Sequence, residues 1–137
     1  MSALTEALYD LLAGDATLTA LLSPYGGAPG IFTTDPAPGD AELPYIVTAG
    51  EVSQAPFDTK TTRGREILRD VRCYASASGS AVTVEAIAER VRALLHRQEL
   101  AVAGFTWVWA SCSGPIVADE SDAYGRIVSV RWTVEET

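Results

Sequence analysis

One helical pattern, with strand-like segments on both sides of it, sets the strongest limit on how this chain can fold. The apolar residues of the pattern are Val84, Ile87, Ala88, Val91, Leu94 and Leu95. At this spacing they form one face of a helix, and such a face has to pack against a core. Residues 45–52 and 65–74 before the helix, and residues 105–112 and 126–135 after it, have the composition of strands. We therefore expect a sheet for the helix to cover.

The last strand, residues 126–135, has the alternation of a half-buried sheet. Its two sets of residues are Val128, Val130, Trp132 and Val134 on the one hand and Ile127, Ser129, Arg131 and Thr133 on the other. Neighbouring side chains of a strand point to opposite faces, so each set lies on one face. The alternation predicts a sheet with one buried face.

The first 22 residues predict two short helices that share a leucine face. The leucines are Leu4, Leu8, Leu11 and Leu12 in the first helix and Leu18, Leu21 and Leu22 in the second. Gly14 is suited to end the first helix, Asp15 to cap the second, and Pro24 to stop it. Residues 23–43 hold four prolines and four glycines, which predicts a loop with no regular element longer than residues 31–34.

The order of elements is α, α, β, β, α, β, β, which favours the α+β class. We expect a mainly antiparallel sheet of about four strands with the helices packed on it. A length of 137 residues suits a single domain over residues 1–137. The polar, threonine-rich residues 53–64 predict a projecting hairpin between the first two strands.

Charge is divided unequally along the chain. Residues 1–59 carry eight acidic residues and no basic one, whereas residues 60–137 carry ten of each, so the whole net charge of −8 comes from the first part. Half of the basic residues lie in and after the predicted hairpin: Lys60, Arg63, Arg65, Arg69 and Arg72. An acidic protein is a poor general binder of nucleic acid, because phosphate neutralisation supplies most of the nonspecific affinity.

This basic cluster has three interpretations: a solvated hairpin, a phosphate contact, or a surface that complements an acidic neighbour. In the third, identical subunits meet head to tail, and the acidic residues 1–59 of one subunit face the basic hairpin of the next. Such a heterologous interface can close into a ring. Charge alone leaves all three interpretations open.

No group of residues has the pattern of an active site. His96 is the sole histidine, and at the C-terminal end of the long helix a structural role is favoured. The segment 111–114 lacks the GxSxG pattern of a nucleophile turn. Asp119, Glu120 and Asp122 lack the ligand spacing of a calcium loop. We expect no enzyme activity, no metal and no cofactor.

Two tryptophans and two cysteines are further candidates for function. Trp107 and Trp109 lie two residues apart in a predicted strand, so we expect them on the same face. There they would form a stacking platform for single-stranded nucleic acid or, as we favour, pack against a helix or a neighbouring subunit. Cys73 and Cys112 have no CxxC spacing and are expected to be reduced and packed. No segment has the apolar length of a membrane helix and the N-terminus has no signal-peptide pattern, so we expect a soluble protein made in the cytosol.

Five segments together resemble the small tail-terminator, or tail-completion, proteins of long-tailed phages and phage-like gene transfer agents. They are LLAGDATLTALL at 11–22, LPYIV at 43–47, RCYA at 72–75, AIAERVRALLH at 86–96 and GRIVSVRWTVE at 125–135. The resemblance spans nearly the whole chain, and its motifs are structural rather than catalytic.

The resemblance implies a structural protein at the head-proximal end of the virion tail, made in the bacterial cytoplasm. The implied oligomer is a hexameric ring that caps the finished tail tube and stops its elongation. The implied partners are other copies of the chain, the tail tube protein and the head-completion or head-closure protein, while DNA passes through the channel without specific binding. The candidate contacts between subunits or between rings are Phe57, Lys60, Arg63, Arg65, Arg69 and Arg72.

Two other functions remain open. The chain could be another connector of the same particle, such as a head-closure or adaptor protein, because small ring-forming α+β proteins can occupy neighbouring positions. It could instead be a small enzyme or ligand-binding domain that uses the strand end at residues 107–114. That alternative predicts a monomer with a concave polar pocket.

Overall fold

The computed structural model describes residues 2–34, 36–48, 51–120 and 122–137. The helices are α1 (Ser2–Ala13), α2 (Ala16–Thr19) and α3 (Val82–Leu95). The strands are β1 (Pro24–Tyr25), β2 (Ala28–Pro29), β3 (Ile31–Phe32), β4 (Tyr45–Val47), β5 (Glu51–Pro56), β6 (Gly64–Ser76), β7 (Phe105–Val117) and β8 (Ala123–Glu136). The prediction of an α+β fold with a mainly antiparallel sheet is confirmed.

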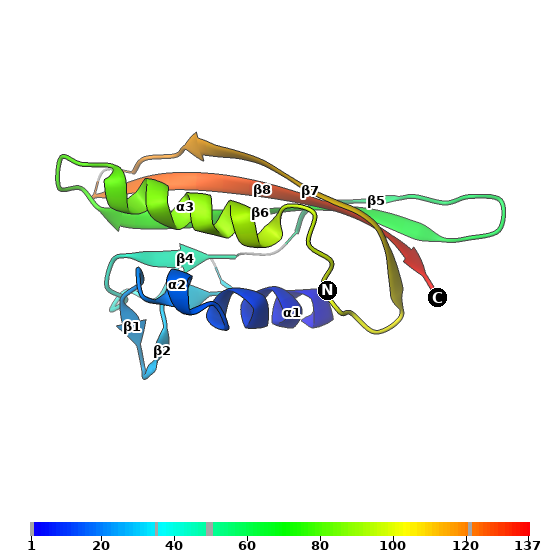
Figure 1. Ribbon diagram of the computed structural model, residues 1–137, viewed down its shortest axis with the longest axis horizontal. Coiled ribbons are helices and arrows are strands. Elements are labelled where there is room, and N and C mark those ends of the chain that lie inside the picture. The colour runs from blue at the N-terminus through cyan, green and yellow to red at the C-terminus, as the bar shows by residue number, and fades with distance from the viewer. Residues whose placement is uncertain (1, 35, 49–50, 121) are drawn as a thin grey trace.

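The long strands β6, β7 and β8 form the frame of the molecule. The order in the six-stranded sheet is β3-β4-β6-β8-β7, and β5 pairs with β6. All pairs in this sheet are antiparallel except β3 with β4. β6 and β8 pair over 13 residues, from Gly64 opposite Glu135 to Ser76 opposite Ala123. Figure 1 shows these strands running the length of the molecule, with α3 lying across one face and α1 and α2 in a further layer beside β4.

The main sheet has six strands and not the four expected, for two reasons. The first is that residues 23–43 contain short strands: β3 joins the main sheet, whereas β1 and β2 form a small sheet of their own. The second lies in the segment that follows. The single strand predicted at residues 45–52 is two strands, β4 and β5, with residues 49 and 50 outside the described part. Both pair with β6 on the side away from β8, β4 opposite residues 72–74 and β5 opposite residues 65–69.

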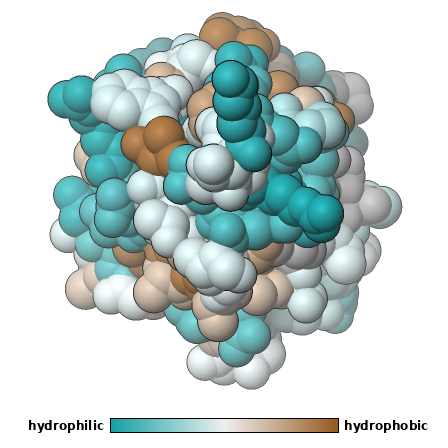
Figure 2. Space-filling view, turned by 90° about the vertical axis from the view of Figure 1, so that its right-hand side faces the viewer, coloured by the Kyte–Doolittle hydropathy of each residue, from teal (hydrophilic) through white to brown (hydrophobic). Residues whose placement is uncertain are grey.

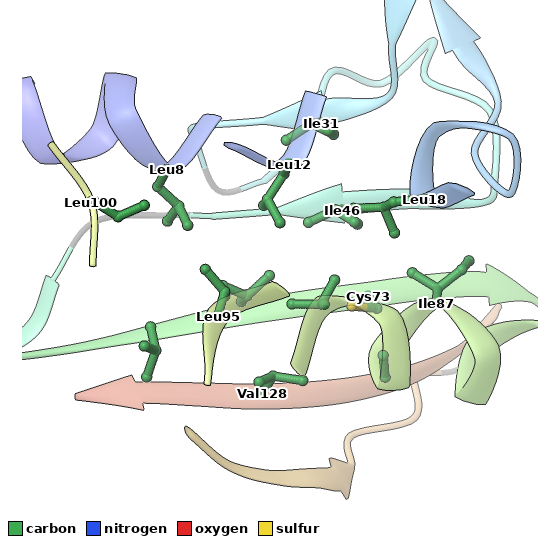
Figure 3. Close-up of a cluster of buried hydrophobic side chains, with 14 of the residues drawn as sticks. Leu8, Leu12, Leu18, Ile31, Ile46, Cys73, Ile87, Leu95, Leu100 and Val128 are labelled. Carbon is green, nitrogen blue, oxygen red and sulfur yellow. The ribbon is translucent and has the colours of Figure 1, made fainter. Parts of the chain in front are cut away.

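The core lies between the helices and the long strands. Figure 3 shows Leu8, Leu12 and Leu18 of the first two helices pointing toward Leu95 and Ile87 of α3, and all five are fully buried. The predicted helical stripe is confirmed, with Leu94 half-buried and the other five residues buried. On β8, the four residues of the predicted core set, Val128 to Val134, are buried as well.

The hairpin formed by β5 and β6 projects from one end of the molecule, at the right of Figure 1. β5 continues to Pro56, so the turn at the end of the hairpin is shorter than the predicted residues 53–64. We call residues 57–63 the hairpin tip.

Asp15 links the N-terminal helices to α3. Its Oδ2 accepts a hydrogen bond from the Leu18 amide at 2.8 Å, which confirms Asp15 as the cap of α2. The same carboxylate accepts two hydrogen bonds from Arg90, at 2.9 Å from Nε and 2.7 Å from Nη2. These Arg90 bonds, chiefly, hold the pKa of Asp15 below its usual value of 3.8.

Because the folded protein lowers the pKa of Asp15, ionised Asp15 stabilises the fold fully above about pH 4, and this stability is lost as the pH falls further. We expect Asp15→Asn to lower the Tm at pH 7 and the difference from the unmodified protein to shrink toward pH 3. Thermal melts between pH 7 and 3 measure this. Glu42→Gln, at an exposed loop residue, is the control and should leave the Tm unchanged.

Candidate functional site

The predicted basic cluster does not form one patch, because its members are spread along β6. Arg65 and Arg72 are seven residues apart on this strand, or about 23 Å at about 3.3 Å per residue. Lys60 and Arg63 lie in the hairpin tip, Arg65 at its base, and Arg69 and Arg72 further along β6. The five basic residues therefore do not share one surface.

Arg69 lies in the core rather than on the surface. Its side chain is fully buried, and its Nη2 donates a hydrogen bond to Thr5 Oγ1 of α1 at 3.0 Å. The alternation along β6 puts Arg69 on the same face as Ile67 and Val71, which are also fully buried. Arg69 therefore fastens α1 to the sheet, and we remove it from the candidate contacts with other subunits. The apolar residues two positions before and after it were the signal in the sequence.

Arg72 lies near the opposite end of the molecule from the hairpin tip. It is half-buried and hydrogen-bonded to Tyr74, whose hydroxyl donates to Glu120 Oε1 at 3.2 Å. Burial is the main reason that the pKa of Tyr74 is raised. Arg72 thus belongs to a local polar cluster and not to the hairpin surface.

The hairpin tip holds its shape through its own hydrogen bonds. The Thr59 amide donates to the Thr62 carbonyl at 2.9 Å, and the two threonine hydroxyls are hydrogen-bonded to each other. The Gly64 amide donates to Asp58 Oδ1 at 3.1 Å. Lys60 and Arg63 are exposed on this ordered turn, and Phe57 is 39% exposed beside them. Figure 2 looks onto this end of the molecule, where hydrophilic surface predominates.

Arg65 fixes the base of the hairpin to the end of the sheet. Its Nε and Nη2 both lie 3.0 Å from Glu136 Oε1, and its guanidinium lies 5.4 Å from the centre of the Phe105 ring. The Glu136 amide donates to the Arg63 carbonyl at 2.7 Å. A hollow beside this contact is lined by residues of β5, the tip, the start of β6 and the end of β8. These contacts hold the base of the projecting hairpin in place. At its tip, Lys60 and Arg63 form no ion pair with any residue that the structure describes.

The two tryptophans of β7 do not lie on one face, contrary to the prediction. Trp107 is opposite Val134 and Trp109 is opposite Thr133, so a β-bulge at residue 108 shifts the register by one. Trp107 packs edge-to-face on Trp132 at 6.1 Å, while Trp109 is 50% exposed under the Arg97 guanidinium, 4.7 Å from its ring centre. A two-tryptophan stacking platform is therefore not formed.

The segment 111–114 is part of strand β7 and not a nucleophile turn. β7 runs through Gly114 to Val117, with an irregularity between Ser113 and Ile116. Gly114 has a φ of 92°, and a Cβ there would lie 2.7 Å from the Ile127 carbonyl oxygen. The Nδ1 of His96 accepts a hydrogen bond from the Cys112 amide at 3.1 Å, so this nitrogen has a backbone partner. The geometry gives His96 the favoured structural role, at the edge of β7.

Two of the three acidic residues, Asp119 and Glu120, have structural partners. Asp119 Oδ1 accepts from the Gly125 amide at 3.0 Å and pairs with Arg126 Nη1 at 3.1 Å. Glu120 accepts the Tyr74 hydroxyl. Within the described ranges, no three His, Cys, Asp or Glu side chains are grouped to hold a metal.

Both cysteines are free thiols packed in the fold, as expected. Burial raises the pKa of Cys73 to about 12 and that of Cys112 to about 11, and Arg92 opposes the second shift. Since the thiolate is the reactive form, we expect neither cysteine of the folded protein to react appreciably with a disulfide reagent at pH 8. Absorbance after reagent addition measures this, with the urea-unfolded protein releasing two equivalents. A Thr61→Cys variant, exposed on the tip, should react at once; fast labelling of the unmodified folded protein would contradict the packing described.

Comparison with known proteins identifies a family for this chain and solved structures that share its fold. A family model described as tail completion protein gp17 matches residues 6–135. A chain in the structure "Virion of native gene transfer agent (GTA) particle" superposes with a TM-score of 0.80 at 22% identity, covering 98% of this chain and 96% of that one. The bacteriophage SPP1 gp17 protein superposes with a TM-score of 0.59 at 26% identity, covering 96% and 88%. No curated protein sequence has a significant match. None of the described helices has the length and apolar character needed to cross a membrane.

Proposed function

We propose a function on the premise that this chain belongs to the tail completion protein gp17 family. It is a tail completion protein, a structural component of a tailed particle of the phage or gene-transfer-agent kind. Our proposal is that several copies form a ring, of six subunits as the resemblance implies, at the head-proximal end of the tail. The ring caps the tail tube, stops its elongation and joins it to the head-completion proteins. DNA passes through its channel without being held.

The family match over nearly the whole chain is the observation that carries this proposal. The likeness of fold to a chain in a native gene transfer agent particle supports it, since 98% of this chain is covered. The firmly held hairpin that projects from the sheet is consistent with a subunit that makes contacts at its end. The His96 imidazole accepts a hydrogen bond from the Cys112 amide, which favours a structural role for it over a role in a small enzyme.

Removal of the gene from the particle-producing strain tests the proposed role. We expect electron micrographs to show heads without attached tails, and tails of uncontrolled length, because the step that ends tube growth is missing. Supplying the chain from a plasmid should restore particles of normal tail length. Tails of normal length that remain detached from heads would instead identify a neck connector. Normal, joined particles would refute both roles.

The position of the protein gives a second test of the same proposal. Particles that contain the chain with an exposed cysteine, Thr61→Cys, can be labelled with gold through a maleimide. We expect label at the junction of head and tail, in a ring around the tube. Label along the whole tail, or at its far tip, would contradict the proposed location.

A further inference from the structure

The two ends of this elongated molecule have different surface chemistry. β6 and β8 run between them, and the 13 paired residues span about 40 Å at about 3.3 Å each. The hairpin tip lies at one end. The other end is formed by the first turns of α3, the last residues of β7 and the start of β8, which we call the acidic end. No side chain of the tip can reach the acidic end of its own subunit.

The hairpin tip offers cations and an aromatic ring. Lys60 and Arg63 are exposed and form no ion pair with any described residue. The one carboxylate of the tip, Asp58, already accepts the Gly64 amide. Phe57, a large apolar side chain that is 39% exposed, lies next to them. This is the composition of a protruding contact rather than of a purely solvated turn.

The acidic end offers the complementary groups around a hollow. The hollow is lined by Glu85, Glu89, Pro115, Val117 and Arg126. Arg126 is already paired, with Glu85 at 3.3 Å and Asp119 at 3.1 Å, while Glu89 has no ion pair among the described residues. Val82, Ile116 and Val117 are 73%, 58% and 66% exposed, which makes them among the most exposed large apolar side chains. Exposed apolar residues next to carboxylates are typical of a surface that binds a partner.

We propose that the hairpin tip of one subunit docks into the hollow at the acidic end of a second copy of this chain, with Lys60 and Arg63 facing Glu85 and Glu89 and Phe57 covering Val117. The argument rests on charge complementarity and on the two surfaces lying at opposite ends of one subunit, which makes the contact heterologous and repeatable. It differs from the sequence-based idea that residues 1–59 are the acidic partner, because at the acidic end Glu85 and Glu89 line the same hollow as the strongly exposed Val117. The inference rests on the proposed function, since a ring or a stack of rings needs such a contact.

Crosslinking in assembled particles tests the contact directly. The variant Thr61→Cys with Val117→Cys, produced in the particle-forming strain, is treated with a bis-maleimide of about 10 Å reach; the native cysteines are packed and give little background. We expect a ladder of covalent multimers of this chain on denaturing gels. Each single-cysteine variant is the control and should give no product larger than a dimer. Normal particles without the ladder would overturn the docking while leaving the proposed function intact, and particles that lack the chain altogether would overturn the proposed function. A crosslink to a different tail protein would also refute docking between copies.

Charge reversal gives a matched second test. We expect the pair Lys60→Glu and Arg63→Glu to lower the yield of complete particles about tenfold, and the pair Glu85→Lys and Glu89→Lys to do the same, because like charges then face each other. Combining all four changes should restore most of the yield. The control Glu6→Lys with Asp10→Lys, on exposed positions of α1, should leave the yield unchanged. If the tip reversal leaves yield and crosslinking unchanged, the docking is wrong; thermal melts of each variant separate lost contact from lost folding.

Discussion

Replacing Trp132 by alanine lowers the free energy of unfolding by about 3–5 kcal/mol, according to the usual cost of removing a large buried aromatic side chain. Trp132 lies in the second half of β8 and is the largest of the fully buried side chains in the described part of the chain. Its ring meets Trp107 edge-to-face at 6.1 Å and an interplanar angle of 67°. A loss of this size is a large share of the roughly 5–15 kcal/mol that holds a typical domain together. Urea unfolding followed by circular dichroism measures the change.

Two further variants identify the cause of the loss at Trp132. Its Nε1–H has no hydrogen-bond partner within the described part of the chain, so Trp132→Phe gives up no hydrogen bond and should cost less than half as much as alanine. Trp109→Ala removes the same kind of side chain from a half-exposed position and should cost least of the three. An equal loss for Trp109→Ala and Trp132→Ala would contradict the core described for β8.

The second large effect is expected at Gly64, the residue that joins the hairpin to the sheet. A Cβ at Gly64 would lie 2.4 Å from the Phe57 carbonyl oxygen and 2.6 Å from that of Val134. One is a backbone atom of the hairpin tip, directly after β5, and the other of β8, so relief requires the tip or β8 to move away from β6. We expect Gly64→Ala to cost about 1–3 kcal/mol, as overpacking does. Hydrogen exchange at the amides of β5 should speed up more than exchange in α3.

Gly39→Ala is the matched control for Gly64→Ala. A Cβ at Gly39 meets no atom within 4 Å, so the same chemical change should leave the unfolding curve nearly unchanged. A Gly64→Ala protein as stable as the control would show that the strands around the hairpin base are packed less closely than described.

Local periodicity was enough to predict the helices and the last strand. The apolar stripe of α3 and the alternation of β8 depend on residues only a few positions apart. The predicted core-facing side of each element is buried, as expected. The cap at Asp15 also follows from residue type at a helix start. Its partner Arg90, 75 residues away, does not, because the pairing depends on how α2 meets α3.

The strands at residues 45–56 and 105–117 were harder to predict, because tertiary pairing decides where they break. One apparent strand is divided between β4 and β5, since two stretches of β6 bind them separately. In β7 a bulge separates Trp107 from Trp109, and no residue type in that segment requires an extra residue at this point. The strand predicted at residues 105–112 is also too short, because pairing with β8 resumes at Ile116, beyond Gly114 and Pro115, and extends β7 to Val117.

Among the candidate contact residues, the sequence placed Lys60 and Arg63 on a projecting hairpin, and the apolar Ile67 and Val71 on either side of Arg69 were its signal that Arg69 points elsewhere. Charge counted along the chain treats all of them alike. In the structure, Arg69 points into the core. Arg72 belongs to the polar cluster around Tyr74, toward the end of β6 that lies away from the hairpin tip. The interface role of the remaining residues, Phe57, Lys60, Arg63 and Arg65, stays a prediction.

The pairing of β6 with β8 also determines when a newly made chain can fold. Asp70 and Ser129, which share a hydrogen bond across these strands, are 59 residues apart, so the loop between them has to close before the pair forms. The leucines of α1 and α2 are made first but are covered by α3 and strands that are made later. On the ribosome, we expect these leucines to stay uncovered until α3 has emerged, and the sheet on which α3 packs is complete only when β8 has been made. The supply of subunits competent for assembly is then expected to depend on this late step and on chaperones that protect the chain before it.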